Sequence, residues 1–422
     1  MDGGDQPVSE AAMDLSDEAA AGAARRDPFG AEIAPDPFGA QIAPDPHGRA
    51  DALAARFYTD PEVERWERDT LLRRHWQLVC HEAEVAAPGA LLPFELHGQD
   101  LFLARDAAGP LRAFENVCPH RGHRLVDGPR EATRITCSYH AWTFGLDGAL
   151  RGARGVDRRD AEGAARDLDR FGLREWRVDR LAGFVFVNAD PAAPSLADHA
   201  PGLEAQMLRA CPDLPDYRAP RDAAEFGHSY RCEANWKVLI DNYLECYHCQ
   251  MAHPEFDALM AIPDSRFALF RNFTHQRAPT KGRAENKAFP LDLTHDVLVG
   301  EFWWMFPNTT FGRFPGVQNF YASRYDPDGP GAARRLTVSL APAVPTDPGA
   351  AQRDRMRSDW VNGVVSAEDR ALCEAVQRGM SRTGFVHGWY VASPEDHGIS
   401  EHAMRHWHDA FRAEAAAVWP DA

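Results

Sequence analysis

Two short segments, residues 118–123 and 137–140, constrain this chain more than any other part of its sequence. The first reads Cys-Pro-His-Arg-Gly-His and the second reads Cys-Ser-Tyr-His, so each carries at least one cysteine and one histidine. Thiolates favour iron–sulfur clusters, and neutral imidazoles also suit iron. Two cysteines on one iron and two histidines on the other are the ligand set of a Rieske [2Fe–2S] centre. The four candidate ligands are Cys118, His120, Cys137 and His140.

A structural zinc site is the alternative, because two cysteines and two histidines also bind zinc. Zinc fingers usually keep their cysteines together and their histidines together, whereas each segment here supplies one ligand of each type. Gly122 and Gly145 also lie where two tight loops around a cluster would need a permissive backbone. We therefore predict an iron–sulfur cluster in preference to zinc.

Charge and cysteine content limit the partners and the compartment of the protein. The net charge of −17 over 422 residues argues against nucleic acid or an anionic membrane as a partner. No apolar stretch is long enough to span a bilayer, and the N-terminus lacks the basic and apolar segments of a signal peptide. The eight cysteines are scattered, so we expect the six outside the cluster, Cys246 and Cys249 among them, to be free thiols. Free thiols suit a reducing cytoplasm, which is the predicted location.

The sequence divides into four regions. Residues 1–50 are acidic and rich in Pro, Ala and Gly, and we expect a disordered tail. Residues 51–75 carry a helical pattern, and we expect this helix to pack on the C-terminal domain. Residues 76–195 contain short apolar runs separated by Gly and Pro, which predicts a small all-β domain with the cluster loops at one tip. Residues 196–422 alternate strand and helix patterns, which predicts an antiparallel sheet flanked by helices and an α+β class for the whole chain.

A second set of candidate metal ligands follows residue 235, in a segment predicted to be helical from 235 to 251. It contains Asp-Asn-Tyr-Leu-Glu-Cys-Tyr-His and, shortly afterwards, His-Pro. Two histidines and one carboxylate on one face of an iron leave positions open for O2 and a substrate. His248 and His253 are five residues apart, which is about 140° of rotation on a regular helix. The helix therefore has to bulge or end between them, and Pro254 is consistent with an end. Two ordinary surface histidines are the alternative.

The carboxylate that would complete this set has to come from elsewhere in the sequence. A predicted helix beginning at Ser366 offers three candidates, which are Glu368, Asp369 and Glu374. Ser-x-x-Asp is also an ordinary helix start, and acids are favoured in a first helical turn. The residues alone therefore do not choose among the three.

Both sets of residues resemble those of the α subunits of Rieske non-haem iron oxygenases. The chain shares Asn-Trp-Lys and Asp-Asn-Tyr-x-Glu-x-Tyr-His-x4-His with their iron-binding helix, and the resemblance covers about residues 53–422. It implies a Rieske [2Fe–2S] domain at 76–195 and a catalytic domain at 196–422 that binds a mononuclear Fe(II). The family pattern Glu-Asp-x-x-Leu-x-Glu-x-Val-Gln places the third iron ligand, after the two histidines, on Asp369.

The resemblance also implies roles for two acids and a set of partners. In similar oxygenases an acid at the position of Glu245, one helical turn before His248, connects an iron ligand to a Rieske histidine of the neighbouring subunit. Asp241, one turn earlier, would support that connection. Such enzymes are homotrimers in which each cluster lies near the next subunit's iron. The chain has no G-x-G-x-x-G dinucleotide motif, so its electrons have to arrive from another protein. The resemblance implies an NAD(P)H-dependent reductase with flavin and iron–sulfur groups.

Within the family, the chain is most similar to oxygenases that act on carnitine, betaines and choline. The similarity rests on residues 241–249 and 252–254, on Gln377-x-Gly379 and on residues 398–402. It implies the oxygenase component of a monooxygenase that hydroxylates a small quaternary ammonium compound or cleaves its C–N bond. Two alternatives stay open, namely an aromatic ring-hydroxylating dioxygenase and a Rieske electron carrier without catalysis.

A quaternary ammonium ion has no N–H group, so carboxylates or aromatic faces have to recognise it. The predicted strand 302–306 carries rings on alternating faces, so we expect either Trp303 or Trp304 to face the pocket, but not both. Trp389 and Tyr390 are a second source of rings. Each of these rings could instead be part of the hydrophobic core.

Overall fold

The structure is a computed structural model, and it describes residues 25–26, 32–33, 51–106, 109–156, 169–219, 229–345, 347–382, 384–392 and 398–420. The chain divides into two compact units, Met1–Pro37 and Phe38–Ala422. In the first unit, β1 (Arg25–Arg26) pairs antiparallel with β2 (Glu32–Ile33). The tail predicted for residues 1–50 otherwise lies outside the described residues.

The described part of the second unit begins with a helical segment that packs against the last helix of the chain. Its elements are α1 (Arg56–Thr59), α2 (Pro61–Trp66), a π-helical turn (Glu67–Leu71) and α3 (Leu72–Arg74). Asp60 starts α2, because its carboxylate accepts a hydrogen bond of 2.8 Å from the backbone N–H of Glu62. The rings of Phe57 and Trp66 meet Phe411 of α12 (His402–Ala415) edge-on, with centroids 5.8 and 5.9 Å apart. These contacts attach the segment to the C-terminal region.

A fully buried ion pair also fastens this segment. The Glu67 and Lys237 side chains are both 0% exposed, and the Lys237 ammonium donates to the Glu67 carboxylate. The indole N–H of Trp236 donates to the same carboxylate at 2.8 Å, and the Asn235 side-chain oxygen accepts from Lys237 at 2.8 Å. Asn235 also caps α7 (Trp236–Tyr243). The Asn-Trp-Lys sequence therefore joins the start of α7 to the N-terminal segment through one satisfied charge cluster.

We expect Glu67→Gln to destabilise the protein strongly, because it leaves the Lys237 charge buried without its anion. Removing one partner of a buried pair costs about 3–5 kcal/mol. Glu175→Gln is the matched control, since Glu175 pairs with Arg112 at the surface and exposed pairs contribute about 1 kcal/mol or less. Urea denaturation followed by tryptophan fluorescence measures both variants. Equal unfolding midpoints would contradict the stabilising role of the buried pair.

Two antiparallel sheets form the all-β region. The larger has the strand order β3-β12-β11-β6-β5-β4-β7, and the smaller has the order β10-β9-β8. The larger sheet contains β3 (Gln77–His81), β4 (Ala90–Leu96), β5 (Gln99–Arg105), β6 (Leu111–Glu115), β7 (Arg130–Glu131), β11 (Glu175–Leu181) and β12 (Phe184–Asn188). The smaller sheet contains β8 (Ile135–Thr136), β9 (Thr143–Phe144) and β10 (Leu150–Gly152). Two 3₁₀ turns are Glu82–Val85 and Asp169–Phe171.

An eight-stranded antiparallel sheet and its helices form the C-terminal region. The strand order is β13-β20-β19-β18-β17-β16-β15, and β14 pairs with β20. The strands are β13 (Tyr217–Arg218), β14 (Tyr230–Cys232), β15 (Arg266–Phe270), β16 (Phe273–Pro279), β17 (Val299–Met305), β18 (Thr309–Arg313), β19 (Phe320–Pro327) and β20 (Ala333–Pro342). The α+β class and the antiparallel sheet flanked by helices are confirmed.

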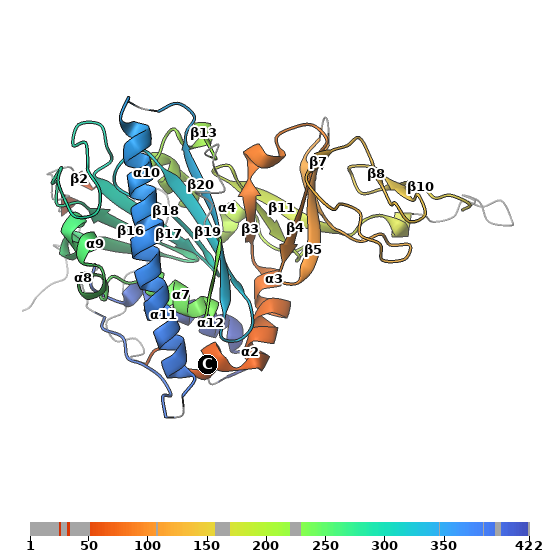
Figure 1. The fold of residues 1–422 in the computed structure, drawn as a ribbon. Helices are drawn as coiled ribbons and strands as arrows, with labels where there is room; N and C mark the ends of the chain where they lie inside the picture. Colours follow the sequence, from red (N-terminus) through yellow and green to blue (C-terminus); the bar gives the residue numbers. More distant parts are fainter. Residues whose placement is uncertain are drawn as a thin grey trace, which may run out of the picture. The chain divides into compact units, whose positions relative to one another are not determined.

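The remaining helices surround this sheet. They are α4 (Leu196–His199), α5 (Leu203–Ala210), α8 (Cys249–Ala252), α9 (Pro254–Leu259), α10 (Ala350–Trp360) and α11 (Ser366–Met380), with 3₁₀ turns at Leu214–Asp216 and Ile262–Asp264. Helix α10 was not predicted. It continues into α11 through a π-helical turn, Val361–Val365, and together they cross the sheet as one long helix (Figure 1).

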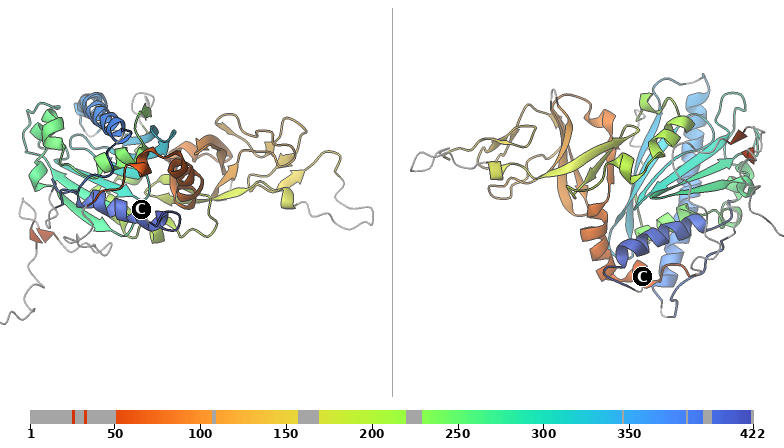
Figure 2. Two further views of the ribbon diagram at one scale, coloured as in Figure 1. Left: turned by 90° about the horizontal axis from the view of Figure 1, so that it is seen from below. Right: turned by 180° about the vertical axis from the view of Figure 1, so that it is seen from behind.

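One hydrophobic core joins the all-β region to the eight-stranded sheet. Leu78 and Phe186 of the all-β region belong to the same buried cluster as Trp303 and Phe311 of the eight-stranded sheet. The small sheet β8–β10 lies at the end of the all-β region that is turned away from the eight-stranded sheet (Figure 2). Helices α8 and α9 lie at the opposite end of this unit, in Figure 1 and in both views of Figure 2.

Two candidate metal centres

The first centre lies in the two loops next to β8 and β9. Cys118 and Cys137 are buried, at 1% and 2% exposure, whereas His120 is exposed. In one loop the backbone N–H of Cys118 donates to the carbonyl of His123 at 2.7 Å. In the other, the N–H of Cys137 donates to the carbonyl of Trp142 at 2.8 Å. The two loops therefore fold alike and carry their thiols in the interior of the tip.

The two candidate imidazoles meet edge-to-face at this tip. The ring centroids of His120 and His140 are 4.7 Å apart, and His120 also stacks on Trp142. Nδ1 of His140 is buried and has no hydrogen-bond partner among the described residues. Burial and the neighbouring thiol of Cys137 raise the pKa of Cys118, so a bound cation is the partner that would favour its thiolate. A partnerless imidazole nitrogen beside two buried thiols fits an iron–sulfur cluster.

The predicted reason for Gly145 in the second loop is wrong. Gly122 does adopt a left-handed backbone, with a φ of +73°, but the left-handed residue of the second loop is Ala141, at +58°. Gly145 is constrained by space instead, because an added Cβ would lie 2.3 Å from Oδ1 of Asp147.

We expect Cys137→Ser to lose the cluster, because the hydroxyl is a poor replacement for a thiolate that anchors iron. Reduction of the wild-type protein with dithionite under anaerobic conditions should give a Rieske-type EPR signal that the variant lacks. Cys211→Ser is the control, since Cys211 is equally buried and lies in another core cluster. A colourless wild-type protein that holds only zinc after growth in iron-replete medium would contradict the cluster.

The second centre forms where the helix predicted for residues 235–251 is interrupted. Helix α7 ends at Tyr243, α8 begins at Cys249, and α9 begins at Pro254. His253 lies between α8 and α9 with non-helical φ and ψ of −123° and 75°. The prediction that the helix bulges or ends between the two histidines is confirmed, because α8 stops just before His253.

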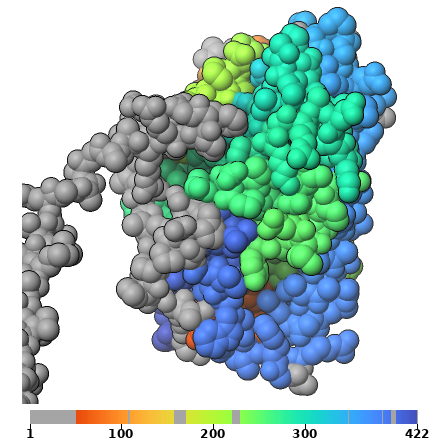
Figure 3. Space-filling view, turned by 90° about the vertical axis from the view of Figure 1, so that its left-hand side faces the viewer, coloured from red at the N-terminus to blue at the C-terminus, as the bar shows by residue number. Residues whose placement is uncertain are grey.

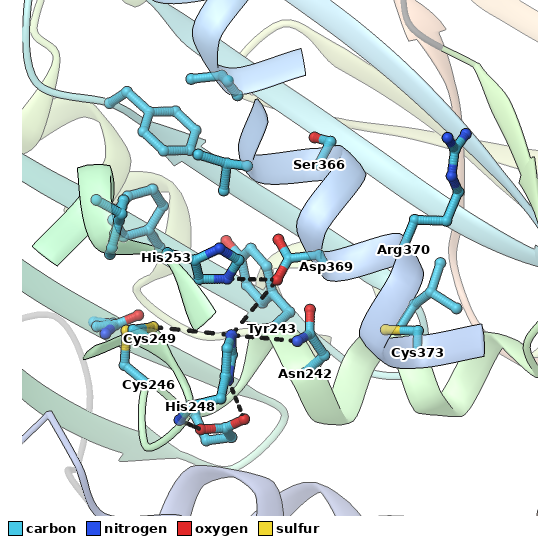
Figure 4. A pocket seen from close by; sticks show the side chains of 18 of the residues that line it. Asn242, Tyr243, Cys246, His248, Cys249, His253, Ser366, Asp369, Arg370 and Cys373 are labelled. Carbon is cyan, nitrogen blue, oxygen red and sulfur yellow. Dashed lines mark hydrogen bonds and ion pairs between the residues drawn. A yellow bond between two sulfur atoms is a disulfide. The ribbon is translucent and has the colours of Figure 1, made fainter. Parts of the chain in front are cut away.

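His248, His253 and Asp369 meet at this interruption. One possible ligand atom from each lies within 4.8 Å of the others. Oδ1 of Asp369 is 2.9 Å from Nε2 of His253 and 3.5 Å from Nε2 of His248 (Figure 4). Burial opposes the ionisation of Asp369, but the two histidines lower its pKa to about 2. A divalent cation would take the place of the shared protons, so these residues fit a metal site of the two-histidine, one-carboxylate type.

A second carboxylate holds each imidazole from its other side. Nδ1 of His253 is 2.7 Å from Oε2 of Glu368, and Nδ1 of His248 pairs with Oε1 of Glu245. Burial opposes the charge on His248, but its contacts with Asp369 and Glu245 raise its pKa to about 10. A carboxylate on Nδ1 fixes the tautomer that directs Nε2 toward a metal.

The three acids that were candidates for the third metal ligand have different contacts in the structure. Helix α11 begins at Ser366, where the sequence predicted a helix start, but it continues directly from the π-helical turn and has no side-chain cap. Asp369 directs its carboxylate to both Nε2 atoms, whereas Glu368 contacts Nδ1 of one histidine. Glu374 accepts from the backbone N–H of Glu233 at 3.3 Å and lies outside the site.

The sequence predicted Glu245 on a helix, but the residue lies in the turn between α7 and α8. Besides Nδ1 of His248, its carboxylate accepts the backbone N–H groups of Tyr247, at 2.5 Å, and of His248, at 3.1 Å. The turn therefore holds the carboxylate against the outer side of this imidazole.

Asp241 lies in a buried network behind the site. Its carboxylate accepts from the hydroxyl of Tyr58 at 2.6 Å and from the indole N–H of Trp407 at 2.9 Å, and it lies 2.9 Å from Nε2 of His408. Asp241 thus connects α7 to the N-terminal segment and to α12. A supporting role in electron transfer remains a prediction.

A cavity opens beside the second centre, and its aromatic lining differs from the prediction. Trp303 and Trp304 are both 0% exposed and lie in two separate core clusters. Trp389 is 70% exposed, and Tyr390 contacts a histidine of α12. None of these four rings lines the cavity. The prediction that Trp303 or Trp304 faces it is wrong, and the alternative, that these two rings are core residues, holds for both. The aromatic residues that do line it are Tyr230, Tyr243, Phe256, Phe302, Phe314, Tyr321 and Tyr325.

The alternation of side chains along β17 is the sequence signal that could have predicted Phe302 in the cavity lining. Phe302 lies on β17 next to Trp303, so its ring points to the opposite side of the sheet. Its ring meets Phe314 at a centroid distance of 5.2 Å, and Phe314 stacks on Tyr321 at 5.9 Å.

At the surface, the light-green α8–α9 segment adjoins the blue C-terminal part of the chain (Figure 3).

Cys246 and Cys249 form a disulfide, so the prediction that both are free thiols is wrong. The turn between α7 and α8 brings their Cα atoms to 4.9 Å, a separation that a disulfide spans. Their Cys-x-x-Cys spacing is the sequence signal that could have found it. Both line the cavity next to His248, on the side away from Arg370 and Cys373 (Figure 4). The other six cysteines are free and buried.

Comparisons with known proteins agree with both centres. Residues 75–170 match the family described as "Rieske [2Fe-2S] domain", and residues 221–416 match "Ring hydroxylating alpha subunit (catalytic domain)". The carnitine monooxygenase oxygenase subunit of Escherichia coli (strain K12) is 35% identical over 361 residues, covering 85% of this chain and 92% of that protein. The chain belongs to the Rieske ring-hydroxylating oxygenase family.

Two further similarities extend along most of this Rieske oxygenase. Chloroplastic choline monooxygenase of Amaranthus tricolor is 27% identical over 350 residues, covering 81% of this chain and 74% of that protein. A solved quaternary ammonium Rieske monooxygenase in complex with L-carnitine has a TM-score of 0.73 at 29% identity, covering 86% of this chain and 95% of that one.

Family membership confirms the two predicted cofactors, a Rieske [2Fe–2S] cluster and a mononuclear iron. The chain is an oxidoreductase and an oxygenase component, which receives its electrons from a reductase. A Rieske electron carrier without catalysis does not fit a chain that matches both domains. Within the described ranges, no helix has the length and hydropathy that a membrane span requires.

Proposed function

We propose that the chain is the oxygenase component of a monooxygenase that hydroxylates a small quaternary ammonium compound or cleaves its C–N bond. The observation that carries the proposal is one cavity that combines the two-histidine, one-carboxylate set with a wall of aromatic rings. The names of the similar proteins, carnitine and choline monooxygenase, support the same substrate class.

The aromatic wall suits the cation of such a substrate. Phe302, Phe314 and Tyr321 contact one another in sequence, so they present a continuous aromatic surface. A quaternary ammonium group cannot donate a hydrogen bond, and ring faces attract it through their quadrupoles. The same wall would also accept an aromatic ring, which keeps a ring-hydroxylating dioxygenase as the second candidate.

In this proposal the chain supplies the ligands and fixes their orientation. The proposed cluster ligands are Cys118, His120, Cys137 and His140, and the proposed iron ligands are His248, His253 and Asp369. When bound, the cluster provides electrons and the iron activates O2. Glu245 and Glu368 hold the imidazoles in one tautomer, and the apolar lining of the cavity excludes water from the substrate.

We further propose a homotrimer in which electrons pass from one subunit to the next. The opposite positions of β8–β10 and α8–α9 within one chain support this (Figures 1 and 2), because they separate the two proposed centres. Inter-subunit electron transfer is also described for a similar solved monooxygenase. Glu245 would connect His248 to a Rieske histidine of the neighbouring subunit, and Asp241 would hold α7 in place. The electrons would come from an NAD(P)H-dependent reductase with flavin and iron–sulfur groups, in the cytoplasm.

Oxygen uptake with a competent reductase tests the substrate class. We expect uptake and aldehyde release with at least one of carnitine, γ-butyrobetaine, glycine betaine, choline and proline betaine. Benzoate, toluene and naphthalene serve as the comparison set. Turnover of an aromatic compound, with none of the ammonium compounds, would replace this proposal with the ring-hydroxylating alternative.

A further inference from the structure

The cavity beside the proposed iron ligands contains a cation with which no carboxylate of the described residues pairs. Arg335, on β20, lines the cavity together with Asp369. Its Nε and Nη2 groups donate to the hydroxyl of Ser323 at 3.2 and 3.1 Å. Its guanidinium lies 5.8 Å from the ring centroid of Tyr230 and 5.6 Å from that of Tyr325. The hydroxyl and the rings hold the side chain in place without supplying a negative charge.

Two other arginines of the same sheet, unlike Arg335, pair with carboxylates. Arg334 pairs with Asp328 at 3.3 Å, and Arg324 pairs with Asp326 at 2.7 Å. Among the described residues, no carboxylate forms a hydrogen bond or ion pair with Arg335. A partly buried cation without an anion is costly unless a charged partner arrives. The cavity is the route by which an anionic group can reach it.

The sheet fixes the position of this cation. In the backbone register Arg335 lies opposite Tyr325 of β19 and Tyr230 of β14, so both flanking rings come from neighbouring strands. Arg370 also lines the cavity, and its guanidinium lies 5.8 Å from the same Tyr230 ring. Figure 4 shows Arg370 beyond Asp369, on the side away from the disulfide. One end of the cavity is therefore cationic, whereas the wall formed by Phe302 and its neighbours is aromatic.

We propose that Arg335 binds the carboxylate of the substrate, and that the chain selects zwitterionic ammonium carboxylates over ammonium alcohols. The inference rests on the proposed function and narrows its substrate class. The guanidinium can bind a carboxylate through charge-assisted hydrogen bonds, while the ammonium group lies against the aromatic wall near the iron ligands. Choline has no carboxylate, so it would bring a second positive charge into the cavity and leave Arg335 without an anion.

Substrate binding to the oxidised holoenzyme, measured anaerobically by calorimetry, tests this proposal alongside steady-state kinetics. We expect Arg335→Gln to weaken carnitine binding and raise its KM by about 10- to 100-fold, while the affinity for choline stays the same or increases. Arg335→Lys keeps the charge and should retain part of the carnitine affinity. Arg334→Gln is the matched control, because this neighbour points to the other face of the strand and is exposed.

The outcomes distinguish a failure of the proposed role of Arg335 from a failure of the proposed function. Equal losses for carnitine and choline in Arg335→Gln, or no loss for carnitine, would show that Arg335 only packs the sheet. If Arg335→Gln does not fold, Arg335→Lys decides, because a packing role predicts equal changes for the two ligands and a carboxylate site predicts a change for carnitine alone. Wild-type holoenzyme that binds neither carnitine nor choline would overturn the proposed function, and the role of Arg335 with it.

Discussion

Glu245→Gln should leave both metal centres in place and lower turnover by about 100-fold, the upper end of the effect expected for a residue that holds a metal ligand through a hydrogen bond. The glutamine side chain can still accept a hydrogen bond from Nδ1 of His248, so the iron should stay bound. The substitution removes the negative charge that the turn after α7 holds against this imidazole. If Glu245 connects the two subunits, electrons from the cluster will then fail to reach the iron.

The oxidation state of the cluster distinguishes this failure from a defect at the iron. In the pre-reduced Glu245→Gln variant, the cluster should remain reduced after substrate and O2 are added, as followed by EPR. Glu368→Gln is the matched control, because Glu368 holds Nδ1 of the other histidine. Its cluster should reoxidise normally once iron is loaded. Normal turnover of Glu245→Gln would exclude the bridging role.

Asp369→Ala should lose the mononuclear iron, keep the cluster and have no measurable turnover. The carboxylate lies next to both Nε2 atoms and is the anionic member of the set, so two neutral imidazoles alone would hold iron weakly. Metal analysis should fall from about three iron atoms per chain to about two, with an unchanged Rieske EPR signal.

Glu374→Gln provides the comparison for Asp369→Ala. Glu374 lies on the same helix but binds a backbone N–H outside the site, so its iron content should match that of the wild type. Full iron content in Asp369→Ala would transfer the ligand role to Glu368, which already contacts His253.

The sequence predicted most of the site because metal ligands require particular residue types at particular spacings. His248 and His253 could be proposed from their spacing, together with the need for the helix to end between them. Asp369 could not be chosen from the residues alone, since the choice depends on how α11 presents consecutive positions to the site. The unpredicted helix α10 and the π-helical turn set that orientation.

The lining of the cavity was harder to predict than its ligands. Alternation along β17 shows which rings share a face, but not where along that face the metal ligands meet the sheet. Phe302 therefore lines the cavity while Trp303 and Trp304 are core residues. Arg335 was not predicted at all. Its proposed role depends on rings from two other strands, and on the finding that no carboxylate of the described residues pairs with it.

A single-turnover experiment on the fully reduced holoenzyme tests the central claim most directly, because it needs no reductase. Mixed with O2 and carnitine, the enzyme should release an aldehyde and an amine in amounts comparable to the number of active sites, and its cluster should become oxidised. No amine from carnitine or from any betaine, together with a cis-diol formed from naphthalene under the same conditions, would contradict the account.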